Sequence, residues 1–204
     1  MSSPRIAIVI YSMYGHIAKM AECVKKGIEG AGGSAIIYQV PETLPQEVLA
    51  KMYAPPKPDY PVIEPTDLTK FDGFVFGIPT RFGNMPAQWR SFWDATGALW
   101  GQGALAGKYA AVFVSTASPG GGQETTAFSL MSTLVHHGIN YVPLGYSHTY
   151  AQQTNMEEVH GGSAWGAGTF SASDGSRQPS ALEQEIASIQ GKMFYNTLAK
   201  INFA

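Results

Sequence analysis

The chain has 204 residues, a length that fits one large domain able to bury a core without disulfides or metals. The net charge of −2 does not favour nucleic-acid partners, and a single cysteine, Cys23, excludes an intrachain disulfide. No apolar stretch approaches the roughly 20 residues that span a bilayer, and the N-terminal MSSPR lacks the apolar region of a signal peptide. We therefore expect one domain, residues 1–204, in the cytoplasm.

Short apolar runs predict the strands of a sheet. They lie at Ile6–Tyr11, Ala35–Val40, Gly73–Ile78, Tyr109–Ser115 and Tyr141–Leu144. The third run is apolar on both faces, which is typical of a parallel strand covered by helices on both sides.

Between these runs, apolar residues recur at helical spacing. Helices are expected from Ile17, from Pro86, over Glu124–His137 and from Ser180, where Ser180 and Glu183 form a capping box. The alternation of strands and helices predicts an α/β fold with a doubly wound, five-stranded parallel sheet and helices on both faces.

In such sheets, ligands bind at the carboxyl ends of the strands, near the point where the strand order reverses. The first loop there contains YSMYGHI from Tyr11. It lacks the G-x-G-x-x-G of dinucleotide-binding turns and the G-K-S/T of nucleotide-triphosphate loops. What remains is the Ser12 hydroxyl, backbone N–H groups and a helix N-terminus, which suit a phosphate monoester. The alternative is an ordinary Ser/Gly turn without a ligand.

The second loop contains GIPTRFGNM, from Gly77. Thr80 and Asn84 can match the polar edge of a flat heterocycle, and Phe82 can line its face. Arg81 can compensate negative charge on such a ligand. Alternatively, Phe82 is a core residue and Arg81 is a solvated surface charge.

The third loop, STASPGGGQE, combines the hydroxyls of Ser115, Thr116 and Ser118 with three glycines, Gly120–Gly122. Such glycines let backbone approach a ligand closely, although a flexible turn would also use them.

Two histidines, His136 and His137, end a predicted helix. Adjacent residues on a helix face different directions, so they do not form an i, i+4 metal pair. A dipole contact at the helix C-terminus is their ordinary role, and no metal site is predicted.

Together these loops resemble the WrbA-type NAD(P)H:quinone oxidoreductases, the family of the fungal 1,4-benzoquinone reductases. The motifs are YSMYGHI, GIPTRFGNM, ALWGQGALAGK, STASPGGGQE, HHG and DGSRQPS, within Arg5–Lys192. The resemblance implies a flavodoxin-like fold, non-covalent FMN and a homotetramer. It also implies two-electron reduction of quinones by NADH or NADPH, through ping-pong hydride transfer by way of FMN.

The resemblance further implies which residues form the site. The FMN-binding residues would be Ser12, Met13, Tyr14, Gly15, His16 and Ile17 at the phosphate, Pro79, Thr80, Arg81, Phe82, Gly83 and Asn84 beside the ring, Ser115, Thr116, Ala117, Ser118, Pro119, Gly120 and Gly121 along its polar edge, and His136. Tyr14 and Trp100 would meet the substrates, and a catalytic His136 would stabilise charge on the ring or on the quinone oxygen. The irregular segment, residues 145–179, would lie at the rim of the site and at subunit contacts.

Two other functions fit the same fold: a flavodoxin-type electron carrier and a non-catalytic flavin-binding regulatory protein. Electron carriers are usually strongly acidic, and the net charge of −2 counts against that role. The intact loops count against a regulatory protein. The charged fraction of 14%, with Trp100 and Trp165, is compatible with buried subunit surface.

Overall fold

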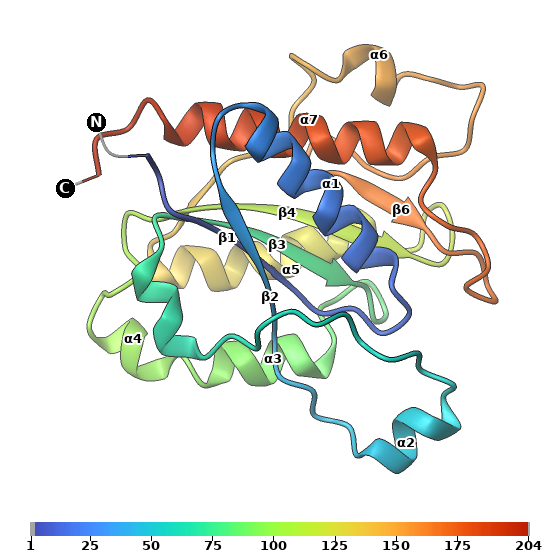
Figure 1. Cartoon of the computed structure of the whole chain (residues 1–204), viewed down its shortest axis with the longest axis horizontal. Helices are drawn as coiled ribbons and strands as arrows, with labels where there is room; N and C mark the ends of the chain where they lie inside the picture. The colour runs from blue at the N-terminus through green and yellow to red at the C-terminus, as the bar shows by residue number, and fades with distance from the viewer. Residues whose placement is uncertain (1–2, 204) are drawn as a thin grey trace.

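The computed structural model of the chain describes residues 3–203 (Figure 1). Its strands are β1 (Ile6–Ile10), β2 (Ala35–Gln39), β3 (Gly73–Pro79), β4 (Tyr109–Thr116), β5 (Asn140–Tyr141) and β6 (Gly168–Phe170). All of these strands pair in parallel, and the order β2-β1-β3-β4-β5 confirms the predicted doubly wound sheet.

The edge beside β4 is shared by two short strands. β5 pairs with the beginning of β4, where Tyr109 faces Asn140, and β6 pairs with its end, where Val114 faces Gly168. Residues 142–167 leave the sheet between them and carry the short helix α6 (Tyr150–Gln153). The fifth strand position is thus confirmed, but the predicted bounds Tyr141–Leu144 were wrong. Pro143 has no N–H to donate to a ladder.

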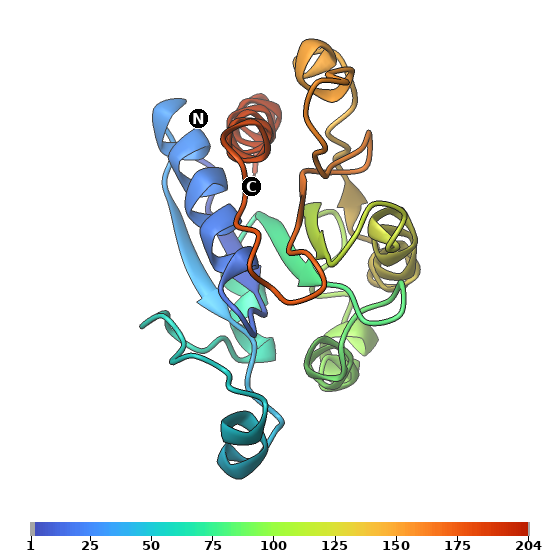
Figure 2. The same cartoon turned by 90° about the vertical axis from the view of Figure 1, so that its right-hand side faces the viewer.

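Helices cover both faces of the sheet, as predicted (Figure 2). One face carries α1 (His16–Gly30) and α7 (Ala181–Leu198), which bury aliphatic side chains against β1, β3 and β4. The other carries α3 (Ala87–Asp94), α4 (Gly97–Gly101) and α5 (Gln123–His137), where Trp89 and Phe76 pack edge to face. The capping box at Ser180 is confirmed, and it begins α7.

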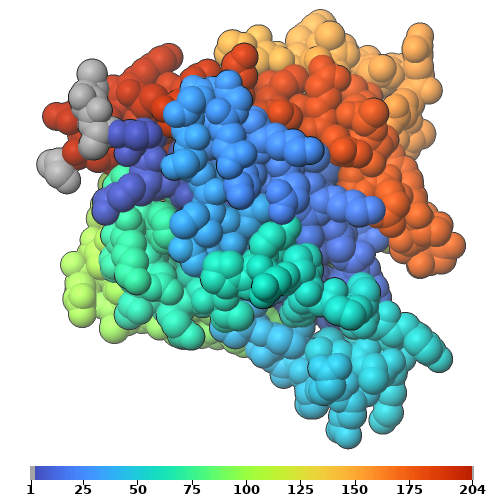
Figure 3. Space-filling view, in the orientation of Figure 1, coloured from blue at the N-terminus to red at the C-terminus, as the bar shows by residue number. Residues whose placement is uncertain are grey.

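A long excursion separates β2 from β3. Its outer part, residues 41–60, contains α2 (Gln46–Lys51) and is called here the α2 excursion. The 3-10 helix η1 (Pro65–Lys70) then leads back to the sheet. Figure 3 shows the α2 excursion standing out from the body of the protein. None of the helices within residues 3–203 is long and apolar enough to cross a membrane.

Candidate functional site

A pocket of about 670 Å³ lies at the carboxyl ends of β1, β3 and β4. It is lined by Ser12, Met13, Tyr14, His16, Ile17, Met52, Tyr53, Pro79, Thr80, Arg81, Ser115, Thr116, Ala117, Ser171, Ala172, Ser173, Asp174 and Gly175. β1 and β3 are neighbours at the point where the strand order reverses, which is where an open α/β sheet binds its ligands. The three predicted loops therefore meet at one pocket, as the parallel topology requires.

The first loop presents backbone donors to this pocket. Gly15, with φ of 91°, turns the chain into α1, and the Ser12 hydroxyl accepts from the N–H groups of Gly15 (3.2 Å) and Ala18 (3.3 Å). Within the described residues, no group accepts from four further N–H groups, those of Met13, Tyr14, His16 and Ile17. The first turn of α1 carries no acidic side chain. These donors at a helix N-terminus fit the phosphate of FMN.

Two side chains of the same loop reach opposite walls of the pocket. The Tyr14 hydroxyl donates to the carbonyl oxygen of Met52 in the α2 excursion, at 3.2 Å. On the other side, Nε2 of His16 lies 2.8 Å from the carbonyl oxygen of Arg177 and donates to it. The imidazole of His16 is therefore a structural link between two loops.

The second loop uses its polar groups to hold its own shape. The Thr80 hydroxyl bonds to the Thr126 hydroxyl at 2.8 Å and accepts from the N–H of Gly83. The side-chain oxygen of Asn84 accepts from the N–H of Met85 at 2.8 Å and from the Arg90 guanidinium. These oxygens are thus engaged within the protein, and Gly83 and Asn84 lie outside the pocket lining.

Arg81 and Phe82, which follow Thr80 in this loop, differ in exposure. Phe82 is fully exposed, so the alternative of a core role for it is wrong. Its φ of 56° places a bulky residue in the left-handed region. Arg81 lines the pocket, and its Nη1 donates to the carbonyl oxygen of Thr80 at 2.8 Å.

One part of the third loop lines the pocket, and another part contacts the second loop. Ser115, Thr116 and Ala117 line the pocket, whereas Ser118–Gly121 do not. Gly122 packs against the backbone of Gly83, so this glycine serves contact between loops. The approach of Gly120 and Gly121 to a ligand stays a prediction.

Two further segments complete the pocket wall, and sequence reasoning missed the first of them. Met52 and Tyr53 come from the α2 excursion, and Ser171–Gly175 form a rim loop. Arg177 closes the rim loop by donating its N–H to the carbonyl oxygen of Ser171 at 3.1 Å. The DGSRQPS motif was the signal for the rim loop, which lies within the segment expected at the rim. The proline-rich sequence of the α2 excursion gave no such signal.

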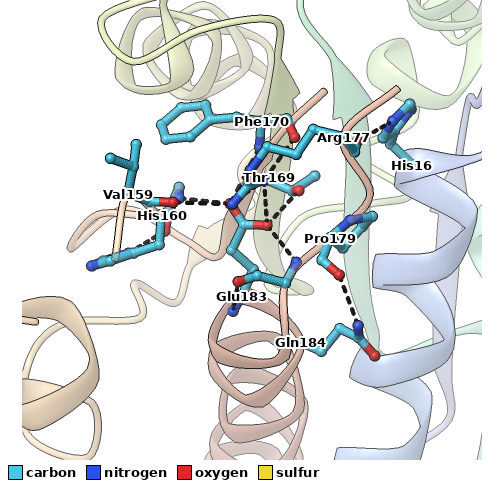
Figure 4. A network of polar contacts seen from close by, with 12 residues as sticks. His16, Val159, His160, Thr169, Phe170, Arg177, Pro179, Glu183 and Gln184 are labelled. Carbon is cyan, nitrogen blue, oxygen red and sulfur yellow. Dashed lines mark hydrogen bonds and ion pairs between the residues drawn. The ribbon is translucent and has the colours of Figure 1, made fainter. Parts of the chain in front are cut away.

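A buried carboxylate anchors this rim (Figure 4). Glu183, with 0% exposure, accepts from Nη1 of Arg177 (2.9 and 3.1 Å), from the Thr169 hydroxyl (2.7 Å) and from the N–H of Ser180 (2.9 Å). It also accepts from the N–H of Gly161 at 2.9 Å. Every one of these partners is a donor, and together the bonds to Glu183 join α7, β6 and the rim loop.

The Arg177 guanidinium also binds two backbone carbonyls. Its Nη1 donates to the carbonyl oxygen of Phe170 at 2.8 Å, and its Nη2 donates to that of Val159 at 3.0 Å. The backbone carbonyl of the same residue accepts from His16, as Figure 4 shows. Arg177 therefore connects buried Glu183, through its side chain, to His16 at the start of α1, through its backbone carbonyl.

Two predicted site residues, His136 and Trp100, lie away from this pocket. His136 and Trp100 line a separate depression of about 330 Å³, with Trp93, Asp94, Thr96, Gly97, Ser132, Thr133 and His137. His136 lies in the last turn of α5, about 20 Å along the helix from Gln123 at 1.5 Å per residue. Within one chain, neither residue lines the first pocket.

The neighbouring histidine is buried. His137 Nε2 lies 2.9 Å from the Thr96 hydroxyl, and burial, followed by the nearby His136, lowers the pKa of His137. The neutral imidazole is therefore favoured there.

A second polar cluster holds the base of the α2 excursion. Glu42 accepts from the Tyr11 hydroxyl (3.0 Å), Lys57 Nζ (2.5 Å) and Gln88 Nε2 (3.1 Å). Burial, followed by Glu42, raises the pKa of Tyr11 well above its ordinary range. These contacts place the α2 excursion against the end of β1, beside the pocket.

Comparison with known proteins identifies the family. Residues 5–153 match the family described as NADPH-dependent FMN reductase. An NAD(P)H quinone oxidoreductase of Candida albicans is 63% identical over 97% of this chain and 100% of its own length. Protoplast secreted protein 2 of Saccharomyces cerevisiae is 62% identical over 97% of this chain and 99% of its own length.

A solved structure supports the fold. A WrbA-like flavodoxin from Agrobacterium tumefaciens superimposes with a TM-score of 0.67, at 22% identity, over 98% of this chain and 100% of that one. The chain belongs to the NADPH-dependent FMN reductase family, which confirms the predicted oxidoreductase class and, with it, FMN and NAD(P)H as its cofactors.

Proposed function

We propose that the protein is an FMN-dependent NAD(P)H:quinone oxidoreductase that reduces benzoquinones by two electrons in ping-pong order. The proposal is carried by the N–H groups of Met13, Tyr14, His16 and Ile17, which no group in residues 3–203 accepts from, beside a pocket to which three sheet loops contribute. The quinone oxidoreductase from Candida albicans, at 63% identity, supports the substrate class. When bound, FMN supplies the group that accepts and returns hydride.

In this proposal, the residues of the chain bind FMN and orient it and the substrates. The N–H groups at the start of α1 would hold the phosphate, and Arg81 would offer a cation to negative charge in the pocket. Ser115 and Thr116, at the end of β4, would face the polar edge of the ring. The α2 excursion and the rim loop close the pocket on two sides. A single pocket supports ping-pong order, because the oxidised nicotinamide has to leave before the quinone enters.

We keep the catalytic role of His136 as part of this proposal, together with a homotetramer. Since His136 and Trp100 lie outside the pocket of their own chain, they would act on the pocket of a neighbouring copy. Their exposure supports this: His136 is exposed and Trp100 is 59% exposed. Sedimentation at micromolar concentration tests the assembly, and a monomer alone would rule it out.

The function is tested by absorbance of the purified protein. FMN should bind, NADH or NADPH should bleach the flavin band directly, and benzoquinone should restore it. A flavin that bleaches only with a separate reductase would indicate an electron carrier. Protein that takes up no FMN would indicate a regulatory role without turnover.

The cytoplasmic location is likewise a proposal. It rests on the single thiol of Cys23, which is buried and fits a reducing compartment. Fractionation of source cells, with the protein recovered outside the cytosolic fraction, would contradict it.

A further inference from the structure

Strained backbone gathers at the pocket. Within residues 3–203, the non-glycine residues with positive φ are Tyr53 (52°), Phe82 (56°) and Ala172 (63°). Tyr53 and Ala172 line the pocket, and Phe82 follows Arg81, which also lines it. Backbone of this kind persists where the surrounding structure holds it, and it clusters at functional sites. Tyr53 is the one whose role neither the motifs nor the family accounts for.

Tyr53 occupies a position that glycine normally takes. It follows α2, where its N–H donates to the carbonyl oxygen of Ala50, and the N–H of Ala54 donates to that of Leu49, both at 3.0 Å. This pair of bonds defines a Schellman motif with Tyr53 at the left-handed position C′. A Cβ is unfavourable there, so the side chain is present at a cost to the backbone.

Within residues 3–203, three other helices end with the same pair of bonds. In α1, α4 and α5 the left-handed position is held by Gly32, Gly103 and Gly138. The fold therefore uses glycine where the motif has only to end a helix. α2 departs from this pattern, and it does so where its end borders the pocket.

The Tyr53 ring has neither a hydrogen-bond partner nor an aromatic partner within residues 3–203, and it is 90% exposed. Its backbone is nevertheless tied to the end of β1, because the Tyr14 hydroxyl donates to the carbonyl of Met52 and the Tyr11 hydroxyl donates to Glu42. The Tyr53 ring is therefore held at the pocket wall with its aromatic face exposed.

We propose that Tyr53 is a specificity-determining residue whose ring stacks on the flat ring of a substrate in the pocket. Nicotinamide and quinone share this flat π system, and an aromatic side chain binds either by offset or edge-to-face contact. The proposal rests on the function proposed above and adds a residue that contacts the substrate. It predicts that loss of the ring weakens substrate binding without weakening the fold.

The test uses the full-length protein loaded with FMN. Tyr53→Gly removes the ring and supplies the residue that the backbone prefers, Tyr53→Phe keeps the ring, and Tyr150→Ala removes another exposed tyrosine, on α6, outside the pocket lining. For each variant, rapid mixing measures flavin reduction by NADPH and reoxidation by benzoquinone across substrate concentrations. Melting temperature, FMN affinity and sedimentation are measured on the same samples.

Tyr53→Gly should melt at or above the wild-type temperature and bind FMN equally well. Its half-saturating substrate concentration should rise about fivefold to tenfold, while Tyr53→Phe and Tyr150→Ala stay close to wild type. A rise confined to NADPH identifies the nicotinamide as the stacked ring, and a rise confined to benzoquinone identifies the quinone. A rise in both half-reactions supports stacking on each in turn.

Unchanged half-saturation in both half-reactions of Tyr53→Gly would overturn the inference. So would a changed sedimentation coefficient, because Tyr53 would then contact another copy of the chain. Failure of the wild-type protein to bind FMN or to be bleached by NADPH would instead overturn the proposed function, so the two failures are distinguishable.

Discussion

Gly83 and Gly122 bring the loops after β3 and β4 into backbone contact. A Cβ added to Gly122 would lie 2.7 Å from the Cα of Gly83, closer than side-chain carbons approach in folded proteins. Gly122 also has a φ of 96°, which other residues rarely adopt. The two loops are thus joined beside the pocket.

We expect Gly122→Ala to separate these loops. The added methyl group meets Gly83 while the backbone is forced into a strained region, so the free energy of unfolding should fall by about 2 kcal/mol. FMN affinity should fall several-fold as well, because Thr80 and Arg81 precede the contact. Thermal melting and FMN titration measure both effects.

Gly120→Ala is the matched control. Gly120 has a φ of 69° in the same glycine run, but an added Cβ would meet no atom within 4 Å. This substitution measures the cost of a side chain at positive φ without the steric contact. Equal effects of the two substitutions would show that contact between the loops contributes nothing.

The parallel sheet explains why much of the pocket could be predicted from the sequence. Each of β1, β3 and β4 ends at the same edge, so loops that are distant in sequence meet there once the alternation of strands and helices is recognised. Ser12 and Gly15 could be predicted to lie at an anion site because the start of a helix leaves N–H groups without intrahelical partners, and that assignment stays a prediction.

The remaining features depend on tertiary contacts without a local pattern. The rim loop reaches the pocket only because Arg177 and Glu183 anchor it, and these contacts join segments that no periodicity relates. The motif containing His136 suggested proximity to the pocket, but the length of α5 carries it away. β6 is three residues long and begins with glycine, too short a run to show alternation.

The bond between His16 and Arg177 should set the distance between two walls of the pocket. His16→Ala removes one partly buried hydrogen bond, worth about 1 kcal/mol, between α1 and the residue that closes the rim loop. FMN affinity should therefore fall about fivefold, with a small change in melting temperature. The control is Lys19→Ala, on the same helix as His16. It removes an exposed bond to the Gln178 side chain and should bind FMN normally. An affinity equal to wild type in His16→Ala would contradict the role of this bond.

Glu183 and Arg177 should behave as one energetic unit. Glu183→Ala leaves the guanidinium without its partner, and Arg177→Ala leaves a buried carboxylate, so each should cost about 3 to 5 kcal/mol of unfolding free energy. Removing both groups should cost clearly less than the sum of the single changes. Chemical denaturation of the two single variants and the double variant measures the coupling. Additive costs would show that the two side chains stabilise the rim independently.

The contacts of Glu42 predict acid sensitivity at the base of the α2 excursion. Burial alone would raise the pKa of Glu42, but hydrogen bonds from Lys57, the N–H of Leu44 and Tyr11 outweigh it, so the pKa is lowered from its ordinary 4.5. A lowered carboxylate pKa stabilises the folded state above pH 4.5, and this stabilisation is lost as the pH falls through the folded value.

Glu42→Gln should therefore be less stable than wild type at pH 6, by about 2 kcal/mol, because hydrogen bonds to a charged group are lost. The difference should shrink towards zero as the pH falls below 4.5, since protonation of Glu42 removes the same contacts from the wild-type protein. Melting temperatures between pH 3 and pH 6, on about ten closely spaced buffers, measure this convergence. Glu47→Gln, an exposed carboxylate on α2 in the same excursion, should show no such gap at either pH. A gap for Glu42→Gln that stays constant with pH would mean that packing, and not the charge of Glu42, holds the excursion beside the pocket.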